Sequence, residues 1–219
     1  MFKAVDFMTM ASFSYSDSLA DYKTFRYDFI QGIHYKNDYF VLMKSEKYRD
    51  LTIVFRGSND SDDWWSNLNF WSEHYNEFGR VHGGFVESYL SLRVDLWRLL
   101  SIHLKQDFKI NIVGHSRGGA LAELCALDIA QRNPNEIRLY TFGSPRVGQN
   151  TYKARFKACE NIIYERYVNG RDPVPTIPWS FKGFRHVAPE IHLKERTWGW
   201  PIIGNVKHHT PQRYLRNLL

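Results

Sequence analysis

Ser116 lies in a glycine-rich turn, within Gly114 to Gly118 (Gly-His-Ser-Arg-Gly), which matches the pattern Gly-x-Ser-x-Gly. A serine hydroxyl is a poor nucleophile at neutral pH, so it needs a base that takes its proton and an acid that orients the base. Where a strand turns sharply into a helix at this pattern, the serine hydroxyl projects at the end of the sheet. A tight strand-to-helix turn without chemistry is the alternative interpretation.

The acid is sought after Ser116, because in sheets with this turn the order along the chain is serine, acid, histidine. Asp172 follows a predicted strand, 162–168, and precedes Pro173, which fixes the turn. Catalytic residues often lie at the ends of strands in such sheets, although an ordinary Asp-Pro turn has the same pattern. Asp128 falls inside a predicted helix, away from any strand end. The sequence therefore favours Asp172.

The base must be one of five histidines: His115, His186, His192, His208 and His209. His115 lies within the serine turn, where a supporting role is expected. A polar predicted hairpin holds His186 and His192, and these are expected at the surface. His208 and His209 come late enough to complete the order, and a neutral imidazole is a natural proton shuttle. Spacing alone does not separate these two.

The reaction at Ser116 also needs donors for a tetrahedral oxyanion. One expected donor is the backbone N–H of Arg117, the residue after the serine. Ser58 ends an earlier predicted strand and offers both its N–H and its hydroxyl. For Ser58 alone, a turn or cap serine is the simpler interpretation.

Strands that alternate with helices from Leu51 onward predict an α/β fold with a mostly parallel sheet covered on both faces. Strands are expected at 39–43, 51–55, 110–113, 137–142 and 162–168, and helices at 4–22, 85–104, 120–130, 151–159 and 205–218. Residues 59–80 are expected to form a polar-aromatic loop, and 185–193 a hairpin. No repeat, linker or shift in composition divides the chain, so one domain, 1–219, is expected.

Composition excludes several classes of protein. The 219 residues are 43% hydrophobic, and no apolar run is long enough to cross a membrane. The first residues do not resemble a secretory signal, so a cytoplasmic location is expected by default. Cys125 and Cys159 are too few for a disulfide framework, and Cys125 is expected in the core. No zinc-ligand spacing occurs, and no metal or cofactor is expected.

The net charge of +6 is uneven, since residues 182–219 hold seven basic and two acidic residues, a balance of +5. Such a patch could attract anionic lipid or nucleic acid, and a solvated charged surface is equally consistent. No nucleic-acid motif accompanies the patch, so no nucleic-acid partner is expected. The oligomeric state does not follow from the sequence.

Six motifs occur in order along the chain: 54–58 (Val-Phe-Arg-Gly-Ser), 81–85 (Val-His-Gly-Gly-Phe), 112–120, 140–148, 166–175 and 209–214. In these residues the chain resembles the class 3 lipase family, the fungal-lipase-like α/β hydrolases. The resemblance implies the α/β-hydrolase fold, with Ser116 as nucleophile, Asp172 as acid and His209 as base. It also implies Ser58 and Arg117 as oxyanion donors. The family often has an acidic residue before its histidine, where this chain has His208.

This resemblance predicts a serine hydrolase, a triacylglycerol lipase or carboxylesterase, that acts on acylglycerols or related lipid esters. A phospholipase or short-chain esterase with the same triad is an alternative, as is a lipase-like binding scaffold without catalysis. The family's lid follows the Arg-Gly-Ser strand, which places Trp64, Trp65 and Leu68 in a lid that opens at a lipid interface. Core packing of these aromatics is the simpler alternative. A second apolar region either lines the acyl site or only covers it: Phe181, Phe184, Trp198, Trp200, Ile202 and Ile203.

Overall fold

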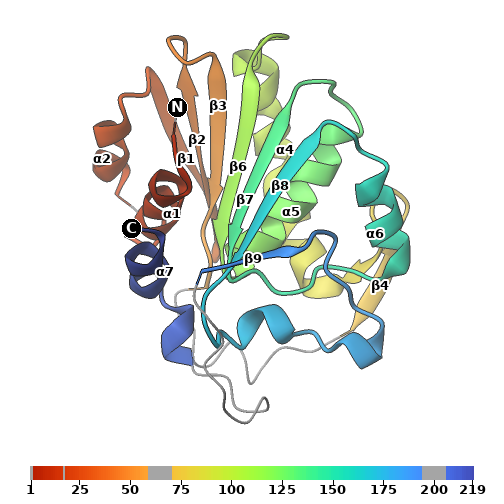
Figure 1. Ribbon diagram of the computed structural model, residues 1–219. Helices are drawn as coiled ribbons and strands as arrows, with labels where there is room; N and C mark the ends of the chain where they lie inside the picture. Colours follow the sequence, from red (N-terminus) through yellow and green to blue (C-terminus); the bar gives the residue numbers. More distant parts are fainter. Residues whose placement is uncertain (1, 17, 59–70, 194–205) are drawn as a thin grey trace.

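The central element of the computed structural model, which describes residues 2–16, 18–58, 71–193 and 206–219, is a seven-stranded sheet. The strand order is β1-β2-β3-β6-β7-β8-β9 (Figure 1). Strands β1 to β3 pair antiparallel, and all later neighbours pair parallel. The strands are β1 (Phe29–Tyr35), β2 (Asp38–Ser45), β3 (Asp50–Phe55), β6 (Lys109–His115), β7 (Ile137–Phe142), β8 (Ile162–Val168) and β9 (Glu190–His192). The expected mostly parallel sheet is confirmed.

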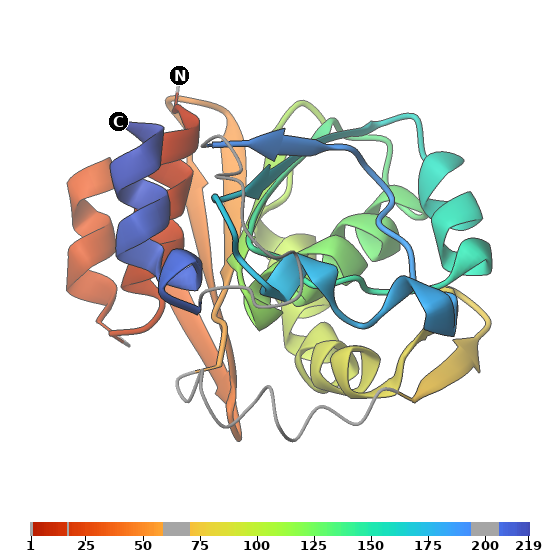
Figure 2. The same cartoon turned by 60° about the horizontal axis from the view of Figure 1, so that its bottom comes forward.

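Helices cover both faces of this sheet (Figures 1 and 2). One face carries α4 (Gly83–His103) and α5 (Arg117–Ala130), and the other carries α1 (Ala4–Phe13) and α7 (Pro211–Leu218), which pack side by side. Ile110 and Ile112 of β6 belong to the core on the first side, whereas Val113 belongs to the core on the second. Burial on both faces explains why the central strands read as continuous apolar runs.

The predicted loop at 59–80 is wrong in its second half, because β4 (Ser72–Tyr75) and β5 (Gly79–His82) form a two-stranded antiparallel hairpin. The turn between them uses Gly79 at φ +80°, a conformation that favours glycine. The predicted hairpin at 185–193 is also wrong. Instead, β9 pairs parallel with β8, and the Leu193 N–H donates to the carbonyl of Val168 at 3.0 Å.

The predicted N-terminal helix over 4–22 is broken. Helix α1 ends at Phe13, and α2 (Leu19–Tyr22) follows with a short 3-10 turn, η1 (Lys23–Phe25). Ser14 and Ser16 donate their hydroxyls to the carbonyls three residues earlier, at 2.7 and 2.9 Å, and such bonds compete with a continuing helix. The closing helix is likewise divided into η4 (Val206–His209) and α7, which starts with Pro211 at a position suited to proline.

The remaining elements are short. Helix α6 (Asn150–Lys157) follows β7, and two 3-10 turns, η2 (Val174–Thr176) and η3 (Ser180–Lys182), lie between β8 and β9. Among the described residues, no helix combines the length and the apolar character that crossing a membrane requires.

Candidate active site

Ser116 occupies a strained turn between β6 and α5. Its backbone lies at φ 59° and ψ −131°, outside the conformations that serine normally adopts. The flanking glycines make the turn possible, because a Cβ on Gly114 would lie 2.1 Å from the carbonyl oxygen of Gly118. A Cβ on Gly118 would lie 2.3 Å from the carbonyl oxygen of Phe55. Strand and helix therefore approach as closely as the backbone permits, with Ser116 at the apex.

Asp172 and His209 form a buried hydrogen-bonded pair. Nδ1 of His209 lies 2.8 Å from Oδ2 of Asp172, and the two residues are 3% and 4% exposed. The phenol of Tyr214 donates to the same oxygen at 2.6 Å, and the N–H of Val174 donates to Oδ1 at 2.9 Å. Because a carboxylate accepts, the Nδ1 atom of His209 carries the proton, and Nε2 is the nitrogen that can accept one.

The serine turn and the Asp172–His209 pair meet at the carboxyl end of the parallel strands. The ring of His115, directly before Ser116, stacks on the ring of His209 with centroids 4.6 Å apart. Gly143, at the end of β7, adjoins both members of the pair, since a Cβ there would lie 2.7 Å from Asp172 Oδ2 and 2.9 Å from the His209 ring. A side chain at residue 143 would therefore collide with the pair.

Tyr15 and His115 fix the backbone of His209. The Nε2 atom of His115 lies 2.7 Å from the carbonyl oxygen of His209, so it donates. The Nδ1 atom then accepts from the phenol of Tyr15 at 2.8 Å. Burial holds the pKa of His115 well below its usual value, which keeps the ring neutral and this polarity fixed. His115 therefore supports the site, as expected. Nothing in the sequence pointed to Tyr15, which lies 100 positions before His115 in the chain.

The two expected oxyanion donors flank the serine turn. Arg117 is the first residue of α5, so its N–H has no acceptor within the helix. Its guanidinium turns toward Asp38 (2.6 Å) and the Ser88 hydroxyl (2.9 Å), a contact that the sequence did not predict. Ser58 follows Gly57, where a Cβ would lie 2.9 Å from the carbonyl oxygen of His115. The chain just after β3, at Gly57 and Ser58, therefore passes beside the turn.

The other histidines are engaged elsewhere. His208 accepts the N–H of Arg171 on its Nδ1 at 3.2 Å, so its ring does not take the place of His209 beside Asp172. His186 was expected at the surface, but it is partly buried and its Nε2 donates to the carbonyl of Pro175 at 2.7 Å. Burial, assisted by nearby cations, lowers the pKa of His186 to about 3. His192 is also partly buried and lies 3.3 Å from Glu190.

The expected lid residues Trp64, Trp65 and Leu68 lie outside the described residues, as do Trp198, Trp200, Ile202 and Ile203 of the second apolar region. The two remaining members of that region differ in their exposure to solvent. Phe184 is buried at 1% exposure, whereas Phe181 is 79% exposed on η3.

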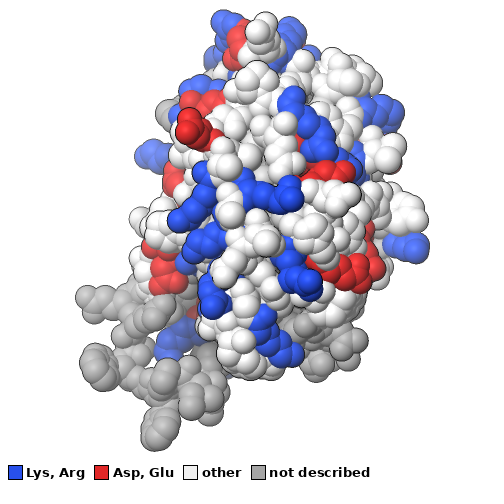
Figure 3. All heavy atoms as spheres, turned by 90° about the vertical axis from the view of Figure 1, so that its right-hand side faces the viewer, with Lys and Arg blue, Asp and Glu red and all other residues white. Residues whose placement is uncertain are grey.

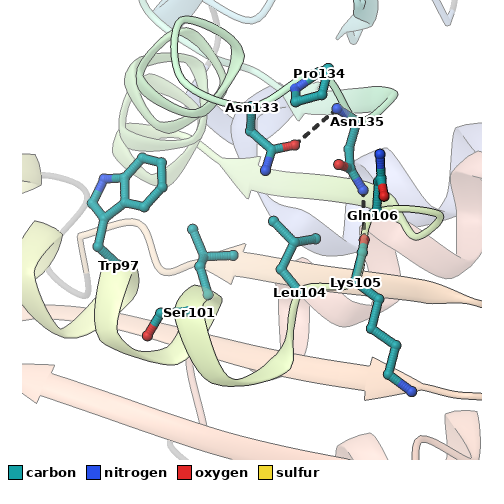
Figure 4. A pocket seen from close by; sticks show the side chains of 9 residues that line it. Trp97, Ser101, Leu104, Lys105, Gln106, Asn133, Pro134 and Asn135 are labelled. Atoms are coloured by element: carbon teal, nitrogen blue, oxygen red, sulfur yellow. Dashed lines mark hydrogen bonds between the residues drawn. The ribbon is translucent and has the colours of Figure 1, made fainter.

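Two cavities lie at the opposite, amino end of the strands. One, of about 460 Å³, is bordered by the end of α4 and by the turn that precedes β7 (Figure 4). There, Asn135 donates to the carbonyl of Lys105 at 2.9 Å. A second, of about 580 Å³, includes Asp50, Lys109 and Arg138 at the starts of β3, β6 and β7. Neither cavity includes Ser116, Asp172 or His209.

Comparison with known proteins agrees with this architecture. The family described as Lipase (class 3) matches residues 52–182. The lipase of Rhizomucor miehei is 34% identical over 165 residues, which cover 72% of this chain and 45% of that protein. The chain spans less than half the length of the curated relatives it matches first.

Solved structures give the same result. The lipase of Rhizopus microsporus var. chinensis matches 88% of this chain and 74% of its own with a TM-score of 0.79 and 25% identity. A triacylglycerol lipase described as having a serine protease triad as its catalytic centre matches 87% of this chain and 79% of its own, with a TM-score of 0.73 and 27% identity. The expected α/β-hydrolase fold is confirmed, and the chain belongs to the class 3 lipase family.

Proposed function

We propose that this protein is a serine hydrolase that cleaves acylglycerols or related lipid esters. The observation that carries the proposal is the buried His209–Asp172 hydrogen bond of 2.8 Å, set beside the strained turn that presents Ser116. The relatives support the class of substrate, since they are described as lipases and, in one solved structure, as a triacylglycerol lipase with a serine protease triad.

In the proposed reaction, the Ser116 hydroxyl attacks the ester carbonyl while Nε2 of His209 takes its proton. Asp172 keeps the proton of the ring on Nδ1 and offsets the positive charge that forms. The N–H of Arg117 and the N–H and hydroxyl of Ser58 stabilise the oxyanion. His209 then protonates the departing alcohol, and water releases the fatty acid from the acyl-enzyme by the same sequence of steps. No step calls for a metal or a cofactor.

The test is hydrolysis of p-nitrophenyl esters by the wild type and by Ser116→Ala. The variant is expected to lose at least about three orders of magnitude in kcat, because the nucleophile is gone. Circular dichroism checks that the variant stays folded. Full activity in a folded Ser116→Ala protein would refute Ser116 as the nucleophile. Absence of ester hydrolysis by the wild type would instead favour the lipase-like scaffold without catalysis.

A panel of acylglycerols, phospholipids and short-chain esters then separates the substrates. Preferential hydrolysis of acylglycerols with long chains supports the lipase function. Faster turnover of phospholipids, or of acetate and butyrate esters alone, would instead make the protein a phospholipase or a short-chain esterase with the same triad.

A further inference from the structure

A stacked and exposed aromatic pair lies at the start of η3, close in sequence to the candidate active site. Trp179 and Phe181 have ring centroids 5.5 Å apart and an interplanar angle of 11°. Phe181 is 79% exposed, the highest value of any aromatic side chain in the described residues, and Trp179 is 43% exposed. Large apolar groups that face water together are typical of a surface that another apolar phase covers.

The aromatic pair belongs to a strongly basic part of the surface. Two described segments, 143–159 and 173–189, hold six basic residues and no acidic one: Arg146, Lys153, Arg155, Lys157, Lys182 and Arg185. The ammonium of Lys182 lies 5.7 Å from the centre of the Trp179 ring. We call these two segments, with the aromatic pair, the basic-aromatic face.

The two segments are fastened to each other by hydrogen bonds. The N–H of Arg146 donates to the carbonyl of Ile177 at 2.7 Å, and that of Arg185 donates to the carbonyl of Gly148 at 2.9 Å. The amide of Gln149 donates to the carbonyl of Lys182 at 3.1 Å. The two segments therefore lie side by side, and Figure 3 shows basic residues outnumbering acidic ones on the side that carries α6.

Cations on and near this surface also act on two of its groups. The pKa of the Arg146 guanidinium is lowered by burial and then by the charges of Arg166 and Arg185. The pKa of His186 is lowered by burial and, further, by Arg166, Arg146 and Lys153. Both groups therefore lie in a region of excess positive charge, to which Arg166 of β8 contributes as well as the face itself.

Both segments of the face begin at the candidate site. Segment 143–159 starts at Gly143, which adjoins Asp172 and His209, and segment 173–189 starts directly after Asp172. We propose that the basic-aromatic face docks the protein on an anionic lipid surface, with Trp179 and Phe181 inserted among the headgroups and the exposed cations Arg155, Lys157 and Lys182 paired with lipid phosphates. This inference rests on the proposed function in one respect, because docking would bring the candidate active site to its lipid substrate.

A second copy of the chain is a poorer occupant of this face. Two identical basic surfaces that meet would repel each other, whereas an anionic lipid surface attracts both the charge and the rings.

The test is co-sedimentation of the full chain with vesicles of phosphatidylcholine alone or mixed with phosphatidylglycerol. The wild type is expected to bind the mixed vesicles at least about tenfold more tightly and to lose this preference in high salt. Trp179→Ser/Phe181→Ser should weaken binding about tenfold or more, and so should Arg155→Gln/Lys157→Gln/Lys182→Gln.

Two matched controls isolate the face. Val94→Ser changes a side chain that is equally exposed, at 79%, on α4, and Lys23→Gln/Lys36→Gln/Lys47→Gln removes three exposed charges elsewhere. Both controls should bind like the wild type. Equal loss in the controls, no preference for phosphatidylglycerol, or absence of vesicle binding would overturn the proposal.

Two further readouts separate this proposal from its alternatives. Ser116→Ala should sediment with vesicles like the wild type although it lacks ester hydrolysis, so docking and catalysis fail independently. Size-exclusion chromatography without lipid tests whether a second copy of the chain occupies the face instead. A dimer that Trp179→Ser/Phe181→Ser dissociates would assign the face to a second copy of the chain and refute lipid docking.

Discussion

At the scale of single residues, His209 is held both at its ring and at its backbone. Its ring bonds to Asp172 at 2.8 Å, and its backbone carbonyl accepts from His115 at 2.7 Å. Asp172 and His115 are each fixed in turn, by the phenols of Tyr214 and Tyr15. Side chains that locked partners hold in place keep catalytic geometry close to the productive one.

Asp172→Asn should lower kcat for p-nitrophenyl esters by about three to four orders of magnitude. The amide can no longer hold the Nδ1 proton of His209, so the ring loses the tautomer that accepts from Ser116. Steady-state kinetics measures this effect, and Asp95→Asn, a change on the exposed surface of α4, serves as the control. A loss of less than tenfold would show that another group orients the ring.

Tyr15→Phe should lower kcat about three- to tenfold, leave KM nearly unchanged, and cost about 1 kcal/mol of stability. The reason is that Nδ1 of buried His115 loses its donor, and the contact to the backbone of His209 loosens. Kinetics and urea unfolding check both effects, with Tyr35→Phe, at 48% exposure, as the matched control. A KM change with normal kcat would instead place Tyr15 against the substrate.

At the scale of elements, the turn from β6 into α5 is the tightest part of the fold that bears on the site. The chain can pass there only because Gly114 and Gly118 lack side chains. A Cβ added to them would lie 2.1 and 2.3 Å, respectively, from the nearest carbonyl oxygens. Helix α5 is held in place by the buried carboxylate of Asp128, which accepts from Tyr89 at 2.6 Å and from Arg93 at 2.8 Å on α4.

Gly118→Ala should destabilise the protein by about 3 kcal/mol and abolish most activity, because the new methyl group would force β3 and α5 apart. Gly84→Ala is the control, since a Cβ there would lie 3.3 Å from its nearest neighbour, in His82. That variant should stay within about 1 kcal/mol of the wild type. Urea unfolding compares the two, and equal stability would contradict the close approach at residue 118.

Many of the strands and helices could be predicted from the sequence. The runs at 110–113 and 137–142 are largely apolar because they are buried on both faces, so their strands were identified. The strand at 162–168 is only partly buried, but it is rich in β-branched and aromatic residues, which favour a strand. The helix after Ser116 was identified as well. Strand β1 was missed because its residues are only half buried and its pattern is weak. Strand β9 was misjudged, since a three-residue polar strand gives no signal of its partner. The contact of Tyr15 with His115 depends on tertiary packing alone.

At the scale of the whole molecule, one sheet separates two apolar cores, and the candidate site lies where the elements of both meet. We propose that residues 1–219 form a single folding domain, because Tyr15 and His209 come from the side of α1 and α7 whereas Ser116 directly precedes α5 on the other side. The stability of the fold should also depend on pH through Glu123, a buried carboxylate of α5. It accepts from the Tyr164 phenol at 2.9 Å.

The wild type should lose stability relative to Glu123→Gln as the pH rises from about 4.5 to about 7. Burial raises the pKa of Glu123 from 4.5 to about 7, so the folded protein holds this proton more tightly than the unfolded chain does. The resulting stabilisation, about 3 kcal/mol, is complete below pH 4.5 and disappears as the pH passes 7. Urea unfolding of both proteins across this range measures the difference. A wild-type stability that stays constant relative to Glu123→Gln, or that increases relative to it as the pH rises, would contradict a neutral buried Glu123.

The most direct measurement of the central claim is labelling with a fluorophosphonate probe, followed by mapping of the adduct by mass spectrometry. The convergence of Ser116, His209 and Asp172 predicts one adduct, on Ser116, and labelling of His209→Ala slower by at least about three orders of magnitude. An adduct on another serine, or labelling of His209→Ala at the rate of the wild type, would contradict the account.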